Sequence, residues 1–191
     1  MLSPSHLHKS IYTPDTGDAF VHSLRTDLEK LLVAKGFKVT GPYDSLDVMT
    51  FPEKQGATLT LTPIIDIRAD NQVTQNTPAT GMLIPGRQEG LFVVGGWVAL
   101  VMLEPMSGEK MWVKRVEVEP VQELYSLTYT VVVRNNQRIQ NIHSDTRPQA
   151  LTTALNRIYP DVLQKAWTYF HPEEVMNVKR QADEVRKLKR Y

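Results

Sequence analysis

Carboxylates and imidazoles are the side chains of this sequence most able to do chemistry. Glu104 and Glu109 flank a short turn, where two carboxylates could act as general acid and base. Turn carboxylates without a perturbing environment are usually solvated, so we expect both to be surface charges and not catalysts. His143 and Asp145 have the spacing of a base and its orienting carboxylate, but no third partner is evident, and we expect them in a surface loop.

The remaining histidines and the missing motifs argue against metal or cofactor chemistry. His6, His8 and His22 could imitate a metal site, but the sequence supplies no further ligand to fix them. The chain has no cysteine, which excludes disulfides, thiolate ligands and thiol nucleophiles. It also lacks a Walker loop, a dinucleotide glycine pattern, a Gly-x-Ser-x-Gly elbow and a His-Glu-x-x-His helix. We therefore expect no catalytic residue, no metal and no cofactor.

The composition is that of an ordinary globular domain. The 191 residues are 41% hydrophobic and 23% charged, which is enough for one sizeable core. A net charge of +1 creates no field that would attract phosphate backbones, so we expect no nucleic-acid partner. The first ten residues lack the apolar core of a signal peptide, and the longest apolar run, 91–103, is too short to span a membrane as a helix.

Periodicity predicts an α+β fold, with an antiparallel sheet packed against an N-terminal helix and C-terminal helices. Apolar residues three and four apart predict helices at 18–35, at 146–159 with a second helical stretch to 170, and from Pro172 onward. Pro160 either kinks or stops the helix between the two stretches. Alternation and β-branched residues predict strands at 37–40, 57–68, 90–103 and 110–119. A strand is also favoured at 125–133, where the pattern alone leaves a helix open as the alternative.

Several details of these elements matter for the site. Gly36 is expected to cap the first helix, and Pro63 to mark either an edge strand or a bulge. The apolar strand at 90–103 is expected to be central and covered on both faces, whereas 71–80 reads as a polar loop. Segment 45–55 is ambiguous between a short helix and irregular structure.

The three tryptophans are expected to pack in the core. They lie at Trp97, Trp112 and Trp167, within predicted strands and a helix. An exposed tryptophan would instead favour a platform on which a sugar could stack.

The turn after the apolar strand and the basic tail are the candidate interaction segments. The turn consists of Glu104, Pro105, Met106, Ser107, Gly108 and Glu109. It could present a recognition surface, or its proline and glycine could simply supply the turn dihedrals. The basic tail carries Lys179, Arg180, Arg186, Lys187, Lys189 and Arg190. Such a tail is either a solvated helix or a contact for lipid head groups or an acidic protein surface.

The string Val101-Met102-Leu103-Glu104-Pro105-Met106-Ser107-Gly108-Glu109 resembles a segment of the HpaA family, the neuraminyllactose-binding hemagglutinin-like outer-membrane lipoproteins. Segments 31–39, 65–70, 154–159 and 182–190 are similar to further parts of that family in the same order. The resemblance spans most of the chain, with the Leu103 to Glu109 run its most specific part. It implies an exported, noncatalytic protein tethered to the outer membrane, with an α+β fold related to envelope domains that build assemblies.

The sequence departs from that family in two places. The lipid anchor of the family requires a cysteine near the mature amino terminus, so an anchor either lies outside this chain or does not exist. The proposed sialic-acid-binding segment of the family is rich in lysine and arginine, whereas the matching region here reads Asn71-Gln72-Val73-Thr74-Gln75-Asn76-Thr77. The resemblance therefore supports an envelope role more than glycan binding.

We expect a flexible segment at 1–14, a single HpaA-like α+β domain at 15–170 and a basic C-terminal helix at 171–191. The expected function is a noncatalytic structural or interaction subunit at the periplasmic side of the outer membrane or at the cell surface. Its partners would be other envelope proteins in an oligomeric assembly, such as a secretion-system or flagellar ring, with outer-membrane lipid or glycans as further candidates. Two alternatives stay open: a sialyl-glycan-binding adhesin, and an enzyme without a recognisable motif.

Overall fold

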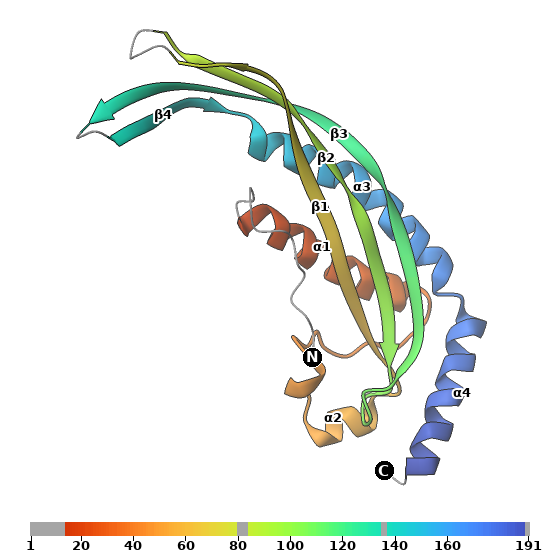
Figure 1. Cartoon of the computed structure of the whole chain (residues 1–191). Coiled ribbons are helices and arrows are strands. Elements are labelled where there is room, and N and C mark those ends of the chain that lie inside the picture. The colour runs from red at the N-terminus through yellow and green to blue at the C-terminus, as the bar shows by residue number, and fades with distance from the viewer. Residues whose placement is uncertain (1–13, 80–83, 135–136, 190–191) are drawn as a thin grey trace.

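The structure, a computed structural model, describes residues 14–79, 84–134 and 137–189, and it confirms the α+β prediction. Its strands form an antiparallel sheet in the order β1-β2-β3-β4, with helices against one face (Figure 1). The described elements are α1 (Pro14–Ala34), η1 (Leu46–Val48), α2 (Phe51–Gly56), β1 (Thr60–Thr77), β2 (Gly86–Leu103), β3 (Lys110–Arg134), β4 (Gln137–Asp145), α3 (Arg147–Tyr169) and α4 (Pro172–Lys189). Apart from Pro14, the segment 1–14 that we expected to be flexible lies outside the described residues.

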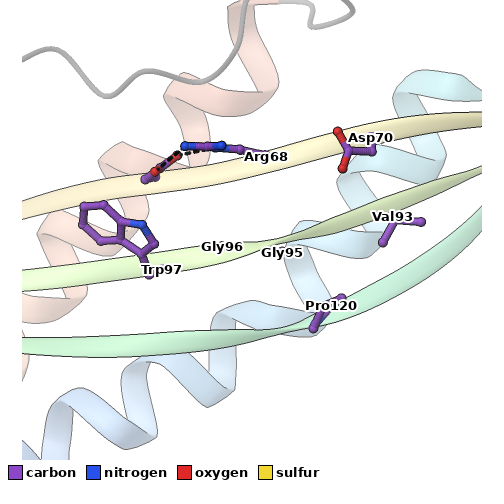
Figure 2. Close-up of a pocket in the computed structure, with 8 residues that line it drawn as sticks. Arg68, Asp70, Val93, Gly95, Gly96, Trp97 and Pro120 are labelled. Atoms are coloured by element: carbon purple, nitrogen blue, oxygen red, sulfur yellow. Dashed lines mark hydrogen bonds and ion pairs between the residues drawn. The ribbon is translucent and has the colours of Figure 1, made fainter.

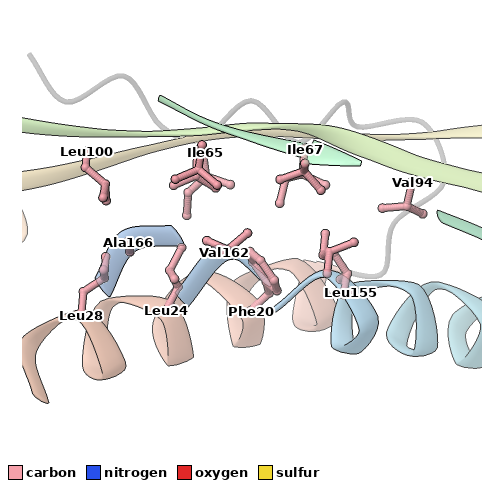
Figure 3. Close-up of a cluster of buried hydrophobic side chains, with 14 of the residues drawn as sticks. Phe20, Leu24, Leu28, Ile65, Ile67, Val94, Leu100, Leu155, Val162 and Ala166 are labelled. Carbon is pink, nitrogen blue, oxygen red and sulfur yellow. The ribbon is translucent and has the colours of Figure 1, made fainter. Parts of the chain in front are cut away.

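The core lies between the inner, concave face of the sheet and the helices α1 and α3. The apolar stripe of α1 places Phe20, Leu24 and Leu28 on one side, and all three are buried. Figure 3 shows side chains of the sheet and of the two helices pointing toward one another, among them Ile65, Ile67, Val94, Leu100, Leu155 and Val162. Burial of each such side chain stabilises the fold by about 1.5–3 kcal/mol, so this layer fixes the position of the sheet on the helices.

The strands are much longer than the helices that cover them. The 25 residues of β3 extend over about 80 Å, whereas the 23 residues of α3 span about 35 Å. The helix α4 follows α3 along the end of the sheet that holds the β2–β3 turn and reaches past it, and the β1–β2 and β3–β4 hairpins project past the helices at the other end (Figure 1). All of β4 except Asp145 is exposed, because none of the described helices packs there.

The helix ends follow the sequence. Gly36 has a φ of 88°, which favours glycine, and ends α1 as predicted. Pro160 lies inside α3, and Pro172 begins α4. The neighbouring Tyr159 donates a 2.6 Å hydrogen bond to Asp27, which joins α3 to α1. Burial and this carboxylate raise the pKa of Tyr159.

Two strand predictions and one loop prediction are wrong in whole or in part. Segment 37–40 is irregular and not a strand, because no neighbouring strand pairs with it. Segment 71–80 is not a loop as far as Thr77, since β1 continues there by pairing with β2. The expected strands 110–119 and 125–133 are one strand, β3, in which Pro120 lies at a register shift where the ladder is already interrupted.

The structure also corrects the burial that we expected. The strand β2 is central, but only its inner face is covered by helices. Trp112 is buried as predicted, whereas Trp97 is half-buried on the opposite, outer face. Trp167 is 45% exposed on α3, where Lys35 Nζ lies 3.8 Å from the centre of its ring, and its prediction as a core residue is wrong.

Sequence reasoning missed β4 altogether and left segment 45–55 open. That segment contains η1 and the short helix α2, whose first turn holds Pro52. Within the described ranges, no helix is both long and apolar enough to cross a bilayer.

Candidate functional site

The turn between β2 and β3 is built around the carboxylate of Glu104. The N–H of Glu104 donates to the carbonyl of Glu109 at 2.9 Å, and the N–H of Gly108 donates back to the carbonyl of Glu104 at 2.8 Å. Gly108 has a φ of 71°, so glycine is the residue type that this turn favours. The Glu104 side chain folds inward and accepts hydrogen bonds from the N–H groups of Met106 (3.0 Å) and Ser107 (2.6 Å).

Arg186 of α4 completes the surroundings of that carboxylate. Its Nε lies 2.7 Å from Glu104 Oε1, across 82 residues of sequence. Its two terminal nitrogens donate to carbonyls at the end of α2, namely those of Lys54, Gln55 and Ala57. One guanidinium therefore joins the β2–β3 turn, the α2 end and α4.

Glu104 is 0% exposed, so its charge depends on these partners. Burial is the largest single influence on its pKa and acts to raise it. The hydrogen bonds donated by Met106, Arg186 and Ser107 together outweigh burial, and the pKa lies below its ordinary value of 4.5. Our prediction that Glu104 is a solvated turn carboxylate is wrong, because a buried anion needs the fixed donors that this turn provides.

A second ion pair joins the same two segments. Lys189 Nζ lies 2.7 Å from Glu109 Oε1, and both side chains are partly exposed. The structure thus brings the predicted turn and the predicted basic tail into contact with each other. Pro105 is buried, and Met106 and Ser107 are half-buried.

The remaining tail residues differ in where they point. Lys179, Arg180 and Lys187 are exposed, and Arg180 bonds to Asn177 on its own helix at 2.7 Å. Arg190 lies outside the described residues. The part of the tail that faces solvent is therefore Lys179, Arg180 and Lys187, and a role for them in binding stays a prediction.

A shallow depression of about 370 Å³ on the outer face of the sheet was not predicted. It lies over β1, β2 and β3, on the face away from the helices (Figure 2). The residues that line it are Asp66, Arg68, Asp70, Val93, Gly95, Gly96, Trp97 and Pro120. We call it the outer-face notch.

Two adjacent glycines create the notch. Gly96 has a φ of 142°, and a Cβ there would lie 2.0 Å from the carbonyl oxygen of Asp66. A Cβ on Gly95 would lie 3.2 Å from Pro120. Because neither residue has a side chain, the floor of the notch is backbone, between Trp97 and Val93 on the same strand. A glycine pair inside a strand pattern was the signal that could have found it.

The notch combines an aromatic ring with fixed charges. Arg68 makes two 3.0 Å hydrogen bonds to the carboxylate of Asp66, which is paired with Trp97 across the ladder. The guanidinium of Arg115 lies 4.5 Å from the centre of the Trp97 ring. Hydrogen bonding from Arg68 is the main cause that lowers the pKa of Asp66, so this carboxylate is charged at neutral pH. Such a surface can receive a polar ring or a partner side chain.

The other candidate chemical groups are engaged elsewhere. His143 and Asp145 lie in β4 and not in the surface loop that we expected. His143 Nε2 lies 2.9 Å from Thr130 Oγ1, and Asp145 makes a bidentate ion pair with Arg147, so the two do not form a catalytic pair. His22 is exposed on α1, and His6 and His8 lie outside the described residues. In the ranges that the structure describes, no three His, Cys, Asp or Glu side chains gather where they could hold a metal ion.

The buried ion pair yields a stability prediction. We expect Glu104→Gln to lower the free energy of unfolding by about 3 kcal/mol at neutral pH, because Arg186 loses its buried anion. The folded-state pKa of Glu104 lies below 4.5, so its stabilisation is complete above that pH and disappears as the pH falls through the folded-state value. The difference in the free energy of unfolding between the wild type and Glu104→Gln should therefore become smaller at acidic pH. Urea unfolding followed by circular dichroism measures it.

Glu109→Gln is the matched control, since Glu109 forms a partly exposed pair with Lys189. We expect this variant to lower the free energy of unfolding by at most about 1 kcal/mol at any pH. Equal losses in the two variants would show that the Glu104 pair does not hold α4.

Comparison with known proteins agrees with the resemblance in the sequence. The family model described as neuraminyllactose-binding hemagglutinin precursor (NLBH) matches residues 6–189. The fold is similar to a crystal structure from Helicobacter pylori described as a neuraminyllactose-binding hemagglutinin homolog, with a TM-score of 0.64 and 14% sequence identity. That match covers 90% of this chain and 84% of the other.

At 14% identity, the structural match establishes a shared fold and nothing further. No curated protein matches the sequence. The family match, in contrast, extends over nearly the whole chain and includes both the β2–β3 turn and the tail that pairs with it. This chain therefore belongs to the neuraminyllactose-binding hemagglutinin (NLBH) family.

Proposed function

We propose that this chain is a noncatalytic interaction protein of the bacterial cell envelope. It acts at the periplasmic side of the outer membrane or at the cell surface, as a subunit of an oligomeric assembly such as a secretion-system or flagellar ring. The observation that carries the proposal is the uncovered sheet. Helices cover the inner face of its proximal part, the part that packs on α1 and α3. Among the described residues, no helix covers the outer face or the distal part, which is the two hairpins that project past the helices (Figure 1).

The use of the charged side chains supports a binding role. Glu104, His143 and Asp145, the groups best suited to acid–base chemistry, are each held by a structural partner. Catalysis needs a group poised to exchange a proton with substrate, and these contacts leave none of the three in that position. The family name also describes binding and not a reaction.

Site-specific photocrosslinking in the native envelope tests this proposal. A photoreactive amino acid at Leu124, which is 74% exposed on β3, should form covalent adducts with other envelope proteins. The same group at Asn156, an exposed position of α3, should form few adducts, because that helix is not part of the uncovered sheet. A chain that gives no envelope adducts from the sheet, or equal adducts from both positions, would contradict the proposal.

A second candidate function is binding of a sialylated glycan, and the outer-face notch favours it. A sugar ring can pack against Trp97, and the cation of Arg68 or Arg115 can attract the carboxylate of a sialic acid. The family name includes neuraminyllactose as a ligand. If this chain binds a sialylated glycan, the outer-face notch would take the place of the family's basic glycan-binding segment, which this chain lacks at 71–77.

Saturation-transfer NMR with sialyllactose, and with lactose as the neutral comparison, tests the second candidate. Trp97→Ala should weaken sialyllactose binding at least about tenfold, which corresponds to about 1.4 kcal/mol of lost contact. Trp167→Ala removes an exposed tryptophan from α3 and should leave binding unchanged. Absence of saturation transfer to sialyllactose, or an equal loss of sialyllactose affinity in the two variants, would contradict the glycan-binding function.

A further inference from the structure

The strand β4 is an edge strand whose outer side has no partner within the described residues. It pairs with β3 along one side, from Arg134 opposite Gln137 to Leu127 opposite Asp145. Two of its apolar side chains are exposed, Ile139 at 43% and Ile142 at 54%. An exposed edge offers a row of unpaired N–H and C=O groups that can bind another strand.

The two edges of this sheet differ in how they are protected. The other edge, β1, contains Pro63, which has no N–H to donate, and the charged residues Asp66, Arg68 and Asp70. Its distal part is interrupted by a register shift between Val73 and Gln75. Such features discourage pairing between strands of different molecules. In β4, Arg138 is the only charged residue from Gln137 to Ser144, and there is no proline.

The hairpin register shows which backbone groups of β4 face outward. Arg134 and Gln137 are paired on either side of a two-residue connection, and such a pair normally exchanges hydrogen bonds. Alternation along the ladder then directs the N–H and C=O groups of Arg138, Gln140 and Ile142 away from β3. The ladder stays regular up to Ile142, and its register shifts only beyond that residue.

We infer that β4 binds β4 of a second copy of this chain, antiparallel and centred on Gln140. This inference deepens the interaction role proposed above and rests on it. In this register Gln140 faces its equivalent, and Arg138 faces Ile142 of the second copy, so the outward groups of the two strands meet each other. About six backbone hydrogen bonds form, two for each facing pair.

Charge and side-chain chemistry favour the second copy as the occupant. Antiparallel pairing places the two Arg138 side chains about 14 Å apart, whereas parallel pairing in register would place these like charges side by side. The aliphatic part of Arg138 covers the exposed Ile142 of the other strand. On the opposite face the two Ile139 side chains become diagonal neighbours, so each exposed isoleucine gains an apolar contact.

The first test is sedimentation velocity of the full chain over a wide range of concentration. The wild type should show a reversible monomer–dimer equilibrium. Gln140→Lys places two ammonium groups opposite each other and should raise the dimer dissociation constant at least about tenfold. Gln75→Lys, at an exposed position of the other edge, is the matched control and should behave as the wild type. Both positions are exposed, and thermal unfolding verifies that both variants fold.

Disulfide trapping tests the register, because the natural sequence contains no cysteine. Facing residues of a hydrogen-bonded pair have Cα atoms about 5.5 Å apart, which a disulfide can bridge. Gln140→Cys should therefore form a covalent dimer under mild oxidation, and Gln75→Cys should not. A wild type that stays monomeric at every concentration, or a Gln140→Lys variant that dimerises normally, would overturn the inference. A chain that is monomeric but is crosslinked to other envelope proteins would overturn this inference alone and leave the proposed function standing.

Discussion

A mismatch in length between strands and helices governs this structure. A residue advances about 3.3 Å along a strand and 1.5 Å along a helix, so a helix of similar residue count covers less than half of a strand. The contact between α1, α3 and the inner face buries Leu24, Ile67 and Val98 completely, and this proximal part holds the core. In the part of the chain that the structure describes, the distal sheet has no such layer, and its strands are held by the ladders of β1 with β2, β2 with β3 and β3 with β4.

The same mismatch explains the position of α4. Where α3 ends, Trp112 of β3 stacks on Phe170 and donates a 2.9 Å hydrogen bond to Glu174, so the chain continues along the sheet instead of leaving it. The apolar seam of α4 is narrow, with Val175, Val178 and Ala182 as its buried residues. A seam of that size needs a second attachment, and the buried Glu104 with Arg186 supplies it at the far end. The turn that carries the most specific family resemblance thus attaches α4 to the sheet, and a role for its exposed residues in binding stays a prediction.

Sequence reasoning correctly predicted the elements whose residue types reflect their surroundings, such as an apolar stripe that packs in the core. The stripe of α1, the cap at Gly36 and the start of α4 at Pro172 follow from local pattern. Pro63 indicated an edge strand or a bulge, and β1 is an edge strand. Sequence reasoning failed for segments that form a strand through backbone pairing alone. The strand β4 and the distal part of β1 are polar and uncovered, so no alternation of buried and exposed residues reveals them.

The candidate site was foreseen only in part, for a related reason. The turn and the tail were both identified, but the ion pair between them joins residues 82 positions apart and cannot be read from spacing. The outer-face notch depends on the absence of side chains at Gly95 and Gly96 and on strand register. A lone tryptophan in a strand, such as Trp97, reads as a core residue until the register shows which face it occupies.

Amide hydrogen exchange tests most directly the claim that the helix-covered part of the sheet holds the fold and the distal part is left for partners. The measurement is made on the full chain, dilute enough to be monomeric. Amides of β4 should exchange long before those of Ile67, Val98 and Val116, which lie over α1 and α3. If β4 is as slow to exchange as those core positions, the distal sheet is part of one uniformly stable unit and the account is wrong.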